Sequence, residues 1–310
     1  MKTGSFPYAF FQGKIVPIED AKVSVMTNAL QYGTGFFGGI RGYYNNEQNF
    51  VSLFRIEDHI KRFIDAAKIL GGDLPYTSQE FKKNIIELVK KNQPKTNLYI
   101  RLFGYIGHTN LSPNFTDAHF DFSSYIIPLE EYMPMGKGLS LLVSSWQRIN
   151  DNSISTLAKA TGGYINSALA RKEANENGYD EAILLNKFGN VAEGSAENIF
   201  IIRDNKLITP GFSEGVLEGV TRKSVLKVAE DMGIETVERP IERSELYIAD
   251  EAFLTGTACQ VAWIEKIDRR TIGNGKIGPI TSQLRKKFFK IVNGEDEQYS
   301  KWCTKLEIEN

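Results

Sequence analysis

Apolar and polar residues alternate in short runs along the opening part of the chain. Residues 9–12 and 14–17 alternate in this way, as do residues 40–44 and 51–54, and a polar turn at residues 45–47 separates the last two. A period of two residues turns one face of a strand inward and the other outward. We therefore expect two β-hairpins.

The period changes after the second hairpin. From Ile56 to Leu70 apolar residues recur at helical spacing, and Gly71 ends the pattern, so we expect a helix here. Thr77, followed by Glu80 and a second apolar stripe, predicts another helix that begins with a capping box. Further strands are expected at residues 98–106 and 122–128.

Residues 129–138 are the best candidate for a linker, because they contain two glycines and one proline and show no periodicity. The chain then divides into predicted domains at residues 1–128 and 139–310. In the second domain the pattern predicts strands at residues 139–145, 181–185, 198–203, 253–255 and 262–267, and helices at residues 164–177, 220–232 and 281–292.

Composition narrows the kinds of partner. The 310 residues are 42% hydrophobic and 24% charged, as in a globular protein, and the formal net charge is -1. The chain therefore has no basic excess for nucleic acid or an anionic membrane, and no apolar run reaches the roughly 20 residues that span a bilayer. We expect small-molecule partners, with no nucleic acid and no membrane.

The N-terminus and the cysteines indicate the cellular compartment of the protein. The first residues contain Gly, Pro and Lys too early for a secretory signal. Cys259 and Cys303 are too few for a disulfide framework and are not clustered as a zinc site requires, so no metal is expected. These features favour the cytoplasm.

A glycine-rich segment from Gly33 to Gly38 has the spacing of a dinucleotide-binding turn, and Glu57 follows about 20 residues later. That turn requires a helix directly after the glycines, whereas residues 39–44 are rich in Gly and aromatic residues and lead into a hairpin. An ordinary glycine-rich turn is therefore favoured. A protein that binds a nicotinamide dinucleotide remains the alternative from a different class.

Lys159 is a candidate nucleophile. It lies among small residues between Ser155 and Gly163, where the backbone can approach a ligand closely. A nucleophilic lysine must lose its proton near neutral pH, which burial beside a cationic or apolar surface promotes. Most lysines are solvated surface charges, so this interpretation depends on the segments that accompany it.

Glu193 lies in a turn of small residues that leads into the apolar strand at residues 198–203. A pyridine-ring cofactor acts as an electron sink only while its ring nitrogen is protonated, and a buried carboxylate can hold that proton. The alternative is that Glu193 or Glu197 accepts hydrogen bonds from local backbone amides.

Two Gly-Thr turns could bind a phosphate. Val220 and Thr221 open a predicted helix, whose first amides point toward an anion, and residues 255–258 offer further amides and a hydroxyl after a strand. Arg62 could bind the same phosphate through two hydrogen bonds from its charged guanidinium. Thr is also a common helix cap and Arg62 can be an ordinary surface residue, so each feature by itself leaves both readings open.

Together, and in this order, these segments resemble the fold-type IV pyridoxal-phosphate enzymes, and most of all the branched-chain amino acid aminotransferases. The resemblance spans nearly the whole chain. Its motifs are residues 32–41, 59–62, 99–101, 144–146, 158–160, 193–198, 219–222, 246–251 and 256–258.

The resemblance implies an α+β fold with a small N-terminal α/β domain and a larger C-terminal domain that has a β-barrel-like core flanked by helices. It implies pyridoxal 5'-phosphate as cofactor and a homodimer or higher homo-oligomer. It also implies reversible, ping-pong transamination of Leu, Ile and Val with 2-oxoglutarate, which yields branched-chain 2-oxo acids and L-glutamate.

Site residues follow from the resemblance by position. Lys159 would bond the cofactor and move the substrate proton, Glu193 would hold the ring nitrogen, and Arg101 would receive the distal carboxylate of glutamate. The residues implied in cofactor binding are Arg62, Lys159, Tyr164, Glu193, Leu217, Gly219, Val220, Thr221, Gly256 and Thr257. Those implied in substrate binding are Tyr32, Phe37, Arg41, Tyr99, Arg101, Tyr132, Thr257 and Ala258.

The chain departs from the family pattern at a few positions. Gly38 stands where Glu is common, Leu102 replaces a common Pro, and residues 259–263 differ from the usual run. These departures bear on the substrate more than on the cofactor. The alternatives within the fold type are a D-amino-acid aminotransferase and an aminodeoxychorismate lyase.

Overall fold

The computed structural model describes residues 4–116, 119–133 and 136–309, which form two compact units. Unit 1 contains residues 1–130, 158–162 and 290–310, and unit 2 contains residues 131–157 and 163–289. The chain first leaves unit 1 and enters unit 2 within the expected linker. Residues 158–162 and 290–310 belong to unit 1 again. The domain prediction assigned both segments to the C-terminal domain. The predicted domains themselves stay a prediction.

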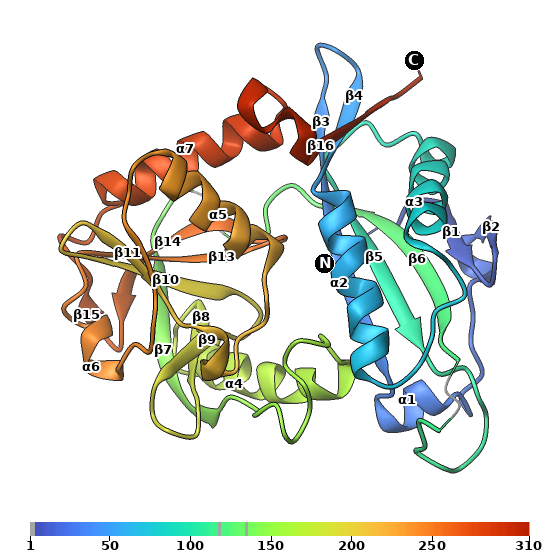
Figure 1. Ribbon diagram of the computed structural model, residues 1–310, viewed down its shortest axis with the longest axis horizontal. Coiled ribbons are helices and arrows are strands. Elements are labelled where there is room, and N and C mark those ends of the chain that lie inside the picture. The colour runs from blue at the N-terminus through green and yellow to red at the C-terminus, as the bar shows by residue number, and fades with distance from the viewer. Residues whose placement is uncertain (1–3, 117–118, 134–135, 310) are drawn as a thin grey trace. The chain divides into compact units, whose positions relative to one another are not determined.

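Unit 1 is built on a seven-stranded sheet with the order β16-β4-β3-β5-β6-β1-β2, in which all neighbours are antiparallel (Figure 1). Both expected hairpins, β1 with β2 and β3 with β4, are confirmed. The strands are β1 (Tyr8–Phe11), β2 (Lys14–Pro17), β3 (Gly35–Asn45), β4 (Phe50–Phe54), β5 (Leu98–Tyr105), β6 (Asp121–Pro128) and β16 (Cys303–Glu307).

Two helices, α2 (Ile56–Ile69) and α3 (Ser78–Asn92), pack on this sheet as their apolar stripes predict (Figure 1). Thr77 accepts from the backbone of Glu80, whose side chain accepts from the backbone of Thr77, so the predicted capping box is confirmed. Phe63 of α2 lies 4.8 Å from Phe36 between ring centroids. Aromatic packing of this kind joins the first helix to β3.

Strand β3 begins earlier than its alternating pattern predicts, because Gly35 and the glycines that follow adopt extended backbone. A short helix that the sequence pattern missed, α1 (Asn28–Tyr32), precedes it and ends at Gly33, whose φ is +66°. A side chain at Gly33 would place its Cβ 3.0 Å from Gly162 Cα. The dinucleotide-binding alternative is wrong here, since a strand stands where its helix is required.

Unit 2 is built on a curled, mixed sheet with the order β12-β11-β10-β13-β14-β7-β8-β9, and β15 pairs with β14 (Figure 1). The pairs β7–β8, β7–β14 and β11–β12 are parallel. The strands are β7 (Leu139–Gln147), β8 (Glu181–Leu185), β9 (Val191–Gly194), β10 (Asn198–Arg203), β11 (Lys206–Thr209), β12 (Thr236–Glu238), β13 (Glu251–Gly256), β14 (Gln260–Ile267) and β15 (Arg270–Thr271).

Helices flank this sheet. Ala170 and Ala174 of α4 (Tyr164–Glu176) pack on Ala182 and Leu184 of β8, where small side chains let helix and strand approach closely. The expected helices at residues 164–177, 220–232 and 281–292 are confirmed as α4, α5 (Val220–Asp231) and α7 (Pro279–Val292), and α6 (Arg243–Leu246) is an additional short helix. In the part of the chain described, none of the helices is long and apolar enough to span a membrane.

Candidate active site

Lys159 lies in unit 1, in a segment tied to the start of β3. The backbone N–H of Phe37 donates to the Lys159 carbonyl at 3.3 Å, and Ala160 forms a β-bridge with Phe36. The Thr161 hydroxyl donates to the Gly33 carbonyl at 2.8 Å. Hydrogen bonds at Lys159 itself and at Thr161, together with the bridge at Ala160, therefore fix the backbone that carries the lysine.

The backbone of Lys159 is itself unusual, because its φ is +50°. This left-handed region is uncommon for a residue with a side chain, and such strain concentrates at functional sites. The Lys159 ammonium lies 5.0 Å from the centroid of the Phe37 ring, which faces it within the same unit. The lysine is thus directed by local structure toward an aromatic residue of the predicted substrate site.

Phe37, Tyr99 and Arg101 form a stack on the neighbouring strands β3 and β5. The Arg101 guanidinium carbon lies 4.4 Å from the Phe37 ring centroid and 5.2 Å from that of Tyr99. Gly39 makes the stack possible, because a Cβ at this position would lie 1.8 Å from the Tyr99 hydroxyl. Burial raises the pKa of Tyr99, so its hydroxyl remains a proton donor at neutral pH. The structure thus brings three predicted substrate residues together.

His59, on α2, is a residue that sequence reasoning did not assign a function. Its side chain is 2% exposed, and Nδ1 has no hydrogen-bond partner among the residues described. Burial lowers its pKa well below the usual value, and the positive charges of Arg62, Arg55 and Lys159 lower it further. His59 is therefore neutral. Arg62, which the resemblance assigns to the phosphate, is half-buried on the same helix.

Tyr32 and Arg41 have other partners in unit 1. The Tyr32 hydroxyl donates to the Leu111 carbonyl at 3.0 Å. Arg41 is buried, and its Nη2 donates to the carbonyls of Leu129, at 3.0 Å, and Glu130. Arg41 therefore anchors the end of β6, and its function in substrate binding stays a prediction.

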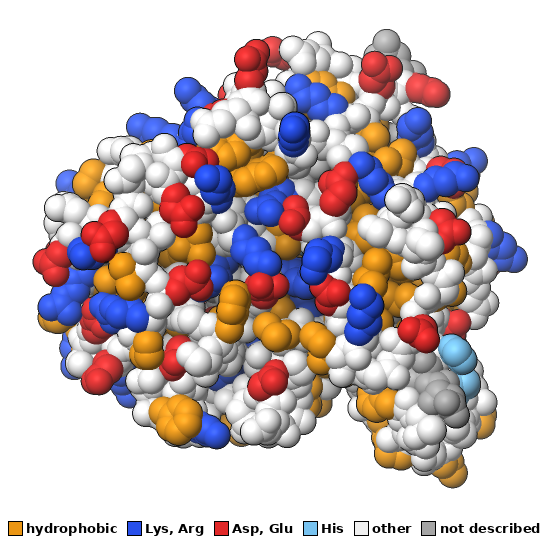
Figure 2. Space-filling model, in the orientation of Figure 1, with side chains coloured by type: hydrophobic (Ala, Val, Ile, Leu, Met, Phe, Trp, Pro, Cys, Tyr) orange, Lys and Arg blue, Asp and Glu red, His pale blue; other side chains and the backbone are white. Residues whose placement is uncertain are grey.

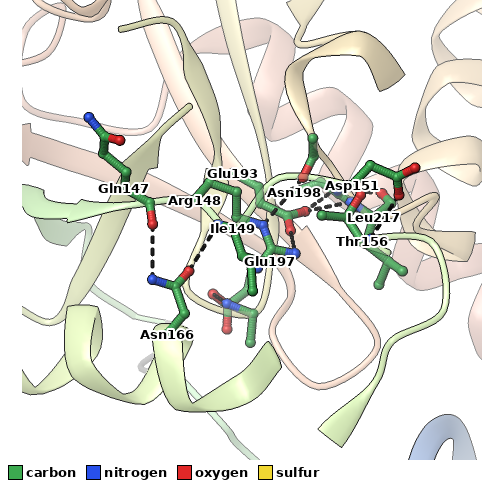
Figure 3. Close-up of polar contacts among 12 residues, drawn as sticks. Gln147, Arg148, Ile149, Asp151, Thr156, Asn166, Glu193, Glu197, Asn198 and Leu217 are labelled. Carbon is green, nitrogen blue, oxygen red and sulfur yellow. Dashed lines mark hydrogen bonds and ion pairs between the residues drawn. The ribbon is translucent and has the colours of Figure 1, made fainter. Parts of the chain in front are cut away.

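Glu193 lies on β9 in unit 2, and both of its carboxylate oxygens have partners (Figure 3). Oε1 forms an ion pair with Nη2 of Arg148 at 2.7 Å. Oε2 accepts from Asn198 Nδ2 and from the backbone N–H of Leu217, each at 3.0 Å. The carboxylate is thus buried, charge-balanced and fixed in direction.

Asn198 joins this carboxylate to the start of α5. Its Nδ2 also donates to the Leu217 carbonyl at 2.9 Å, and a Cβ on Gly219 would lie 2.0 Å from Asn198 Oδ1. Val220 and Thr221 then form the first helical turn, which carries no acidic residue. An acidic side chain therefore does not occupy the positive end of the helix dipole, and the phosphate site expected at this turn stays a prediction.

The remaining predicted residues of unit 2 lie in two groups. Gly256 ends β13, and Thr257 and Ala258 follow it. The buried Thr255 hydroxyl beside them has no hydrogen-bond partner within the described ranges. Tyr164 is the first residue of α4. The Tyr132 hydroxyl accepts from Arg171 Nη1 at 2.5 Å, so that tyrosine is anchored by α4.

Sequence reasoning missed Arg148 and Asn198. Asn198 belongs to the EGSAEN motif, so its position was marked without a function. Arg148 follows the end of β7 and had no sequence signal, because its importance comes from the partner that the fold supplies.

The chain matches the family model of the class IV aminotransferases over residues 35–267, and it belongs to this family. It is 46% identical to a probable branched-chain-amino-acid aminotransferase of Aquifex aeolicus (strain VF5), over 98% of each chain. These matches confirm the resemblance and the fold type predicted from the sequence.

Two solved structures extend the comparison. The branched-chain aminotransferase of Thermoproteus uzoniensis, solved with norvaline, is 42% identical, with a TM-score of 0.93 over 97% of this chain and 99% of the other. The T.th. branched-chain amino acid aminotransferase, solved with N-(5'-phosphopyridoxyl)-L-glutamate, is 37% identical, with a TM-score of 0.92 over 100% of both chains. The α+β fold-type IV architecture is thus confirmed.

Proposed function

We propose that this protein is a pyridoxal-phosphate-dependent aminotransferase that interconverts branched-chain L-amino acids and their 2-oxo acids, with 2-oxoglutarate and L-glutamate as the second pair. The observation that carries the proposal is the full-length similarity to branched-chain aminotransferases, two of them solved with norvaline and with a phosphopyridoxyl derivative of glutamate. The local geometry of each unit supports it.

The residues of the chain fit this cofactor. When bound, pyridoxal phosphate withdraws electrons from the substrate Cα through its protonated ring. Glu193 offers the buried, ion-paired acceptor that a protonated ring nitrogen needs, and the first turn of α5 offers amides and the Thr221 hydroxyl to a phosphate. Leu217 and Gly219 shape this turn, and Arg62, Tyr164, Gly256 and Thr257 complete the proposed set.

Lys159 has two functions in the proposal. Its amine would hold the cofactor, and the same amine would carry the proton that leaves the substrate Cα. Its constrained backbone supports this assignment, because a proton carrier must return to the same position in both half-reactions.

One substrate site must accept an apolar side chain in one half-reaction and a carboxylate in the other. Arg101 stacked on Phe37 suits both, because the ring offers an apolar surface and the guanidinium offers bidentate hydrogen bonds. We assign the distal carboxylate of glutamate to Arg101 and the α-carboxylate to Tyr99 and the Thr257 and Ala258 amides. Tyr32, Arg41 and Tyr132 stay predicted substrate residues.

A panel of L- and D-amino acids tests the proposal. Each is mixed with the cofactor-loaded protein, and the half-reaction is followed by the visible absorbance of the bound cofactor, with 2-oxoglutarate added afterwards. We expect turnover with L-leucine, L-isoleucine and L-valine. Turnover of D-alanine without L-leucine would instead indicate a D-amino-acid aminotransferase, and a colourless protein that ignores added pyridoxal phosphate would exclude the whole class.

We also propose a cytoplasmic homodimer. Apolar side chains are exposed on α1 and the segments beside it (Figure 2), and Val25 and Leu111 are each 81% exposed. Hydrogen bonds from Asn28 to Ser112 and from Tyr32 to Leu111 hold these segments together, so the patch is preformed. The mass in sedimentation equilibrium should be twice that of the chain, and Leu111→Asp should reduce it.

A further inference from the structure

Arg148 is an ordered cation that the proposed function does not use. Its backbone N–H donates to the Leu185 carbonyl at 2.8 Å, and its Nε donates to the Gly215 carbonyl at 3.3 Å. The side chain of Asn166 binds the backbone on both sides of Arg148. It donates to the Gln147 carbonyl at 2.9 Å and accepts from the Ile149 N–H at 3.2 Å (Figure 3). The guanidinium therefore reaches Glu193 from a backbone that α4 holds in place.

The ion pair is buried. The side chains of Arg148 and Glu193 are 11% and 6% exposed. A carboxylate removed from water in this way takes up a proton unless a cation or several donors favour its ionised form. Arg148 supplies that cation, while Asn198 and Leu217 bind the other oxygen.

Neighbouring carboxylates in unit 2 have different partners. Glu197 accepts from the Ala196 N–H at 3.1 Å, and Asp151 accepts from Ser155 at 2.7 Å. Glu214 accepts from two asparagines, Asn186 and Asn190. Within the described ranges, Glu193 is the carboxylate that forms an ion pair with Arg148.

We propose that Arg148 is the positioning residue of Glu193, whose carboxylate it pairs with and directs before the cofactor binds. This rests on the proposed function of Glu193. An ionised carboxylate accepts about four hydrogen bonds, and the three donors described leave about one site for a protonated ring nitrogen. Arg148 also shares the carboxylate charge with that ring, so it sets how strongly Glu193 holds the ring proton.

The first test uses the cofactor-free protein. In Arg148→Met, Glu193 loses its cation, so we expect the buried carboxylate to take up a proton in the folded protein. A protonated Glu193 carboxyl is compatible with burial, so the folded variant is stable at low pH. This stability is lost as pH rises, because the buried carboxyl must then either hold its proton against the solvent or ionise without a cation. We expect the thermal midpoint to fall by about 10 °C at pH 8 and by much less at pH 5.

Two further variants make this test specific. Adding Glu193→Gln to Arg148→Met should restore most of the midpoint and abolish its pH dependence, because no buried charge remains. Arg148→Lys should retain most of the stability, since it keeps a cation. An equal loss at both pH values, unchanged by Glu193→Gln, would overturn the proposal and reduce Arg148 to a packing residue.

The second test measures protons taken up when pyridoxal 5'-phosphate binds, by titration calorimetry in two buffers of different ionisation enthalpy. The wild-type carboxylate needs a proton on the ring, whereas Arg148→Met already carries one on Glu193. The variant should therefore take up about one proton fewer. In the Glu193→Gln background, Arg148→Met should change nothing, and equal uptake by wild type and the single variant would contradict the proposal.

The two tests separate the two claims. If the wild-type protein binds no pyridoxal phosphate, the proposed function fails, while the cofactor-free measurements still decide whether Arg148 controls the ionisation of Glu193. If the cofactor binds and the cofactor-free variants show no coupling between the two residues, the proposal on Arg148 fails and the function stands.

Discussion

The two units hold their proposed functional side chains by different means. In unit 2, three donors with defined directions fix the Glu193 carboxylate. In unit 1, Arg101 is held over Phe37 and Tyr99 at distances typical of cation–π contacts, which tolerate sliding. The first arrangement is rigid and polar, and the second is adaptable.

This difference corresponds to what each side chain has to do. A carboxylate that holds one ring proton needs a single direction and a stable charge, so directional bonds suit it. A substrate site that accepts both leucine and glutamate must admit two side chains of opposite polarity. In the proposed site, non-directional stacking would let Arg101 shift between these substrates without breaking strong bonds, at a cost of about 1 kcal/mol or less.

The largest expected effect, on the rate of the half-reaction, tests the rigid arrangement around Glu193 in unit 2. Glu193→Gln should retain the cofactor, because α5 still binds the phosphate, but slow the half-reaction by at least about a hundredfold, since the ring nitrogen loses its anionic partner. Single-turnover absorbance measures this rate. Glu214→Gln, which changes another buried carboxylate of unit 2, is the matched control and should react at nearly the wild-type rate. A normal rate in Glu193→Gln would reassign the carboxylate.

The next largest effect, on KM, tests the adaptable stack around Arg101 in unit 1. Arg101→Ala should raise the KM for glutamate and for 2-oxoglutarate by about tenfold or more, because a charge-assisted bidentate bond is lost. The KM for leucine should change only about twofold, since leucine uses the ring surface. Steady-state kinetics with both amino acids provides an internal control. Equal losses for the two would show that Arg101 does not distinguish them.

A smaller effect is expected at the glycine beneath the stack. Gly39→Ala would place a methyl group 1.8 Å from the Tyr99 hydroxyl, so the ring must move. We expect a loss of about 1–3 kcal/mol in unfolding free energy and weaker binding of both substrates. The neighbouring Gly38→Ala is the control, because its nearest contact would be 3.4 Å from Leu102. Similar behaviour of the two variants would mean that Tyr99 is not tightly packed.

The smallest effect concerns pH. Because the folded-state pKa of His59 lies below the unfolded value, only the unfolded chain gains its proton as pH falls below about 6.5, so stability decreases in this range. His59→Phe should remove about 1 kcal/mol of the loss between pH 7 and pH 5.5, as measured by urea unfolding. His119→Gln changes an exposed histidine and should leave the loss unchanged. An unaltered pH profile in His59→Phe would show that His59 titrates normally.

The longer elements of the fold could be predicted from the sequence because their signals are local. The stripe of α2 and the capping box at Thr77 lie within a few turns of chain. Strand β16 was missed because its pairing with β4 joins distant parts of the sequence. For the same reason, no local pattern could place residues 158–162 with unit 1.

The candidate site shows the same limit. The sequence predicts Lys159, Glu193 and the start of α5 as site residues because each belongs to a motif. Arg148 was missed because nothing near it in the sequence indicates a buried carboxylate as its partner. Motifs thus predict candidate ligand-binding residues, while the partners of those residues become visible only in the fold.

The central claim is that the Lys159 amine carries the cofactor. Borohydride reduction of the cofactor-loaded protein, followed by digestion and mass spectrometry of the peptides, tests it directly. We predict a phosphopyridoxyl group on the peptide that contains Lys159, at that residue. A label on any other lysine, or a Lys159→Ala variant that still acquires the label and turns over L-leucine, would contradict the account.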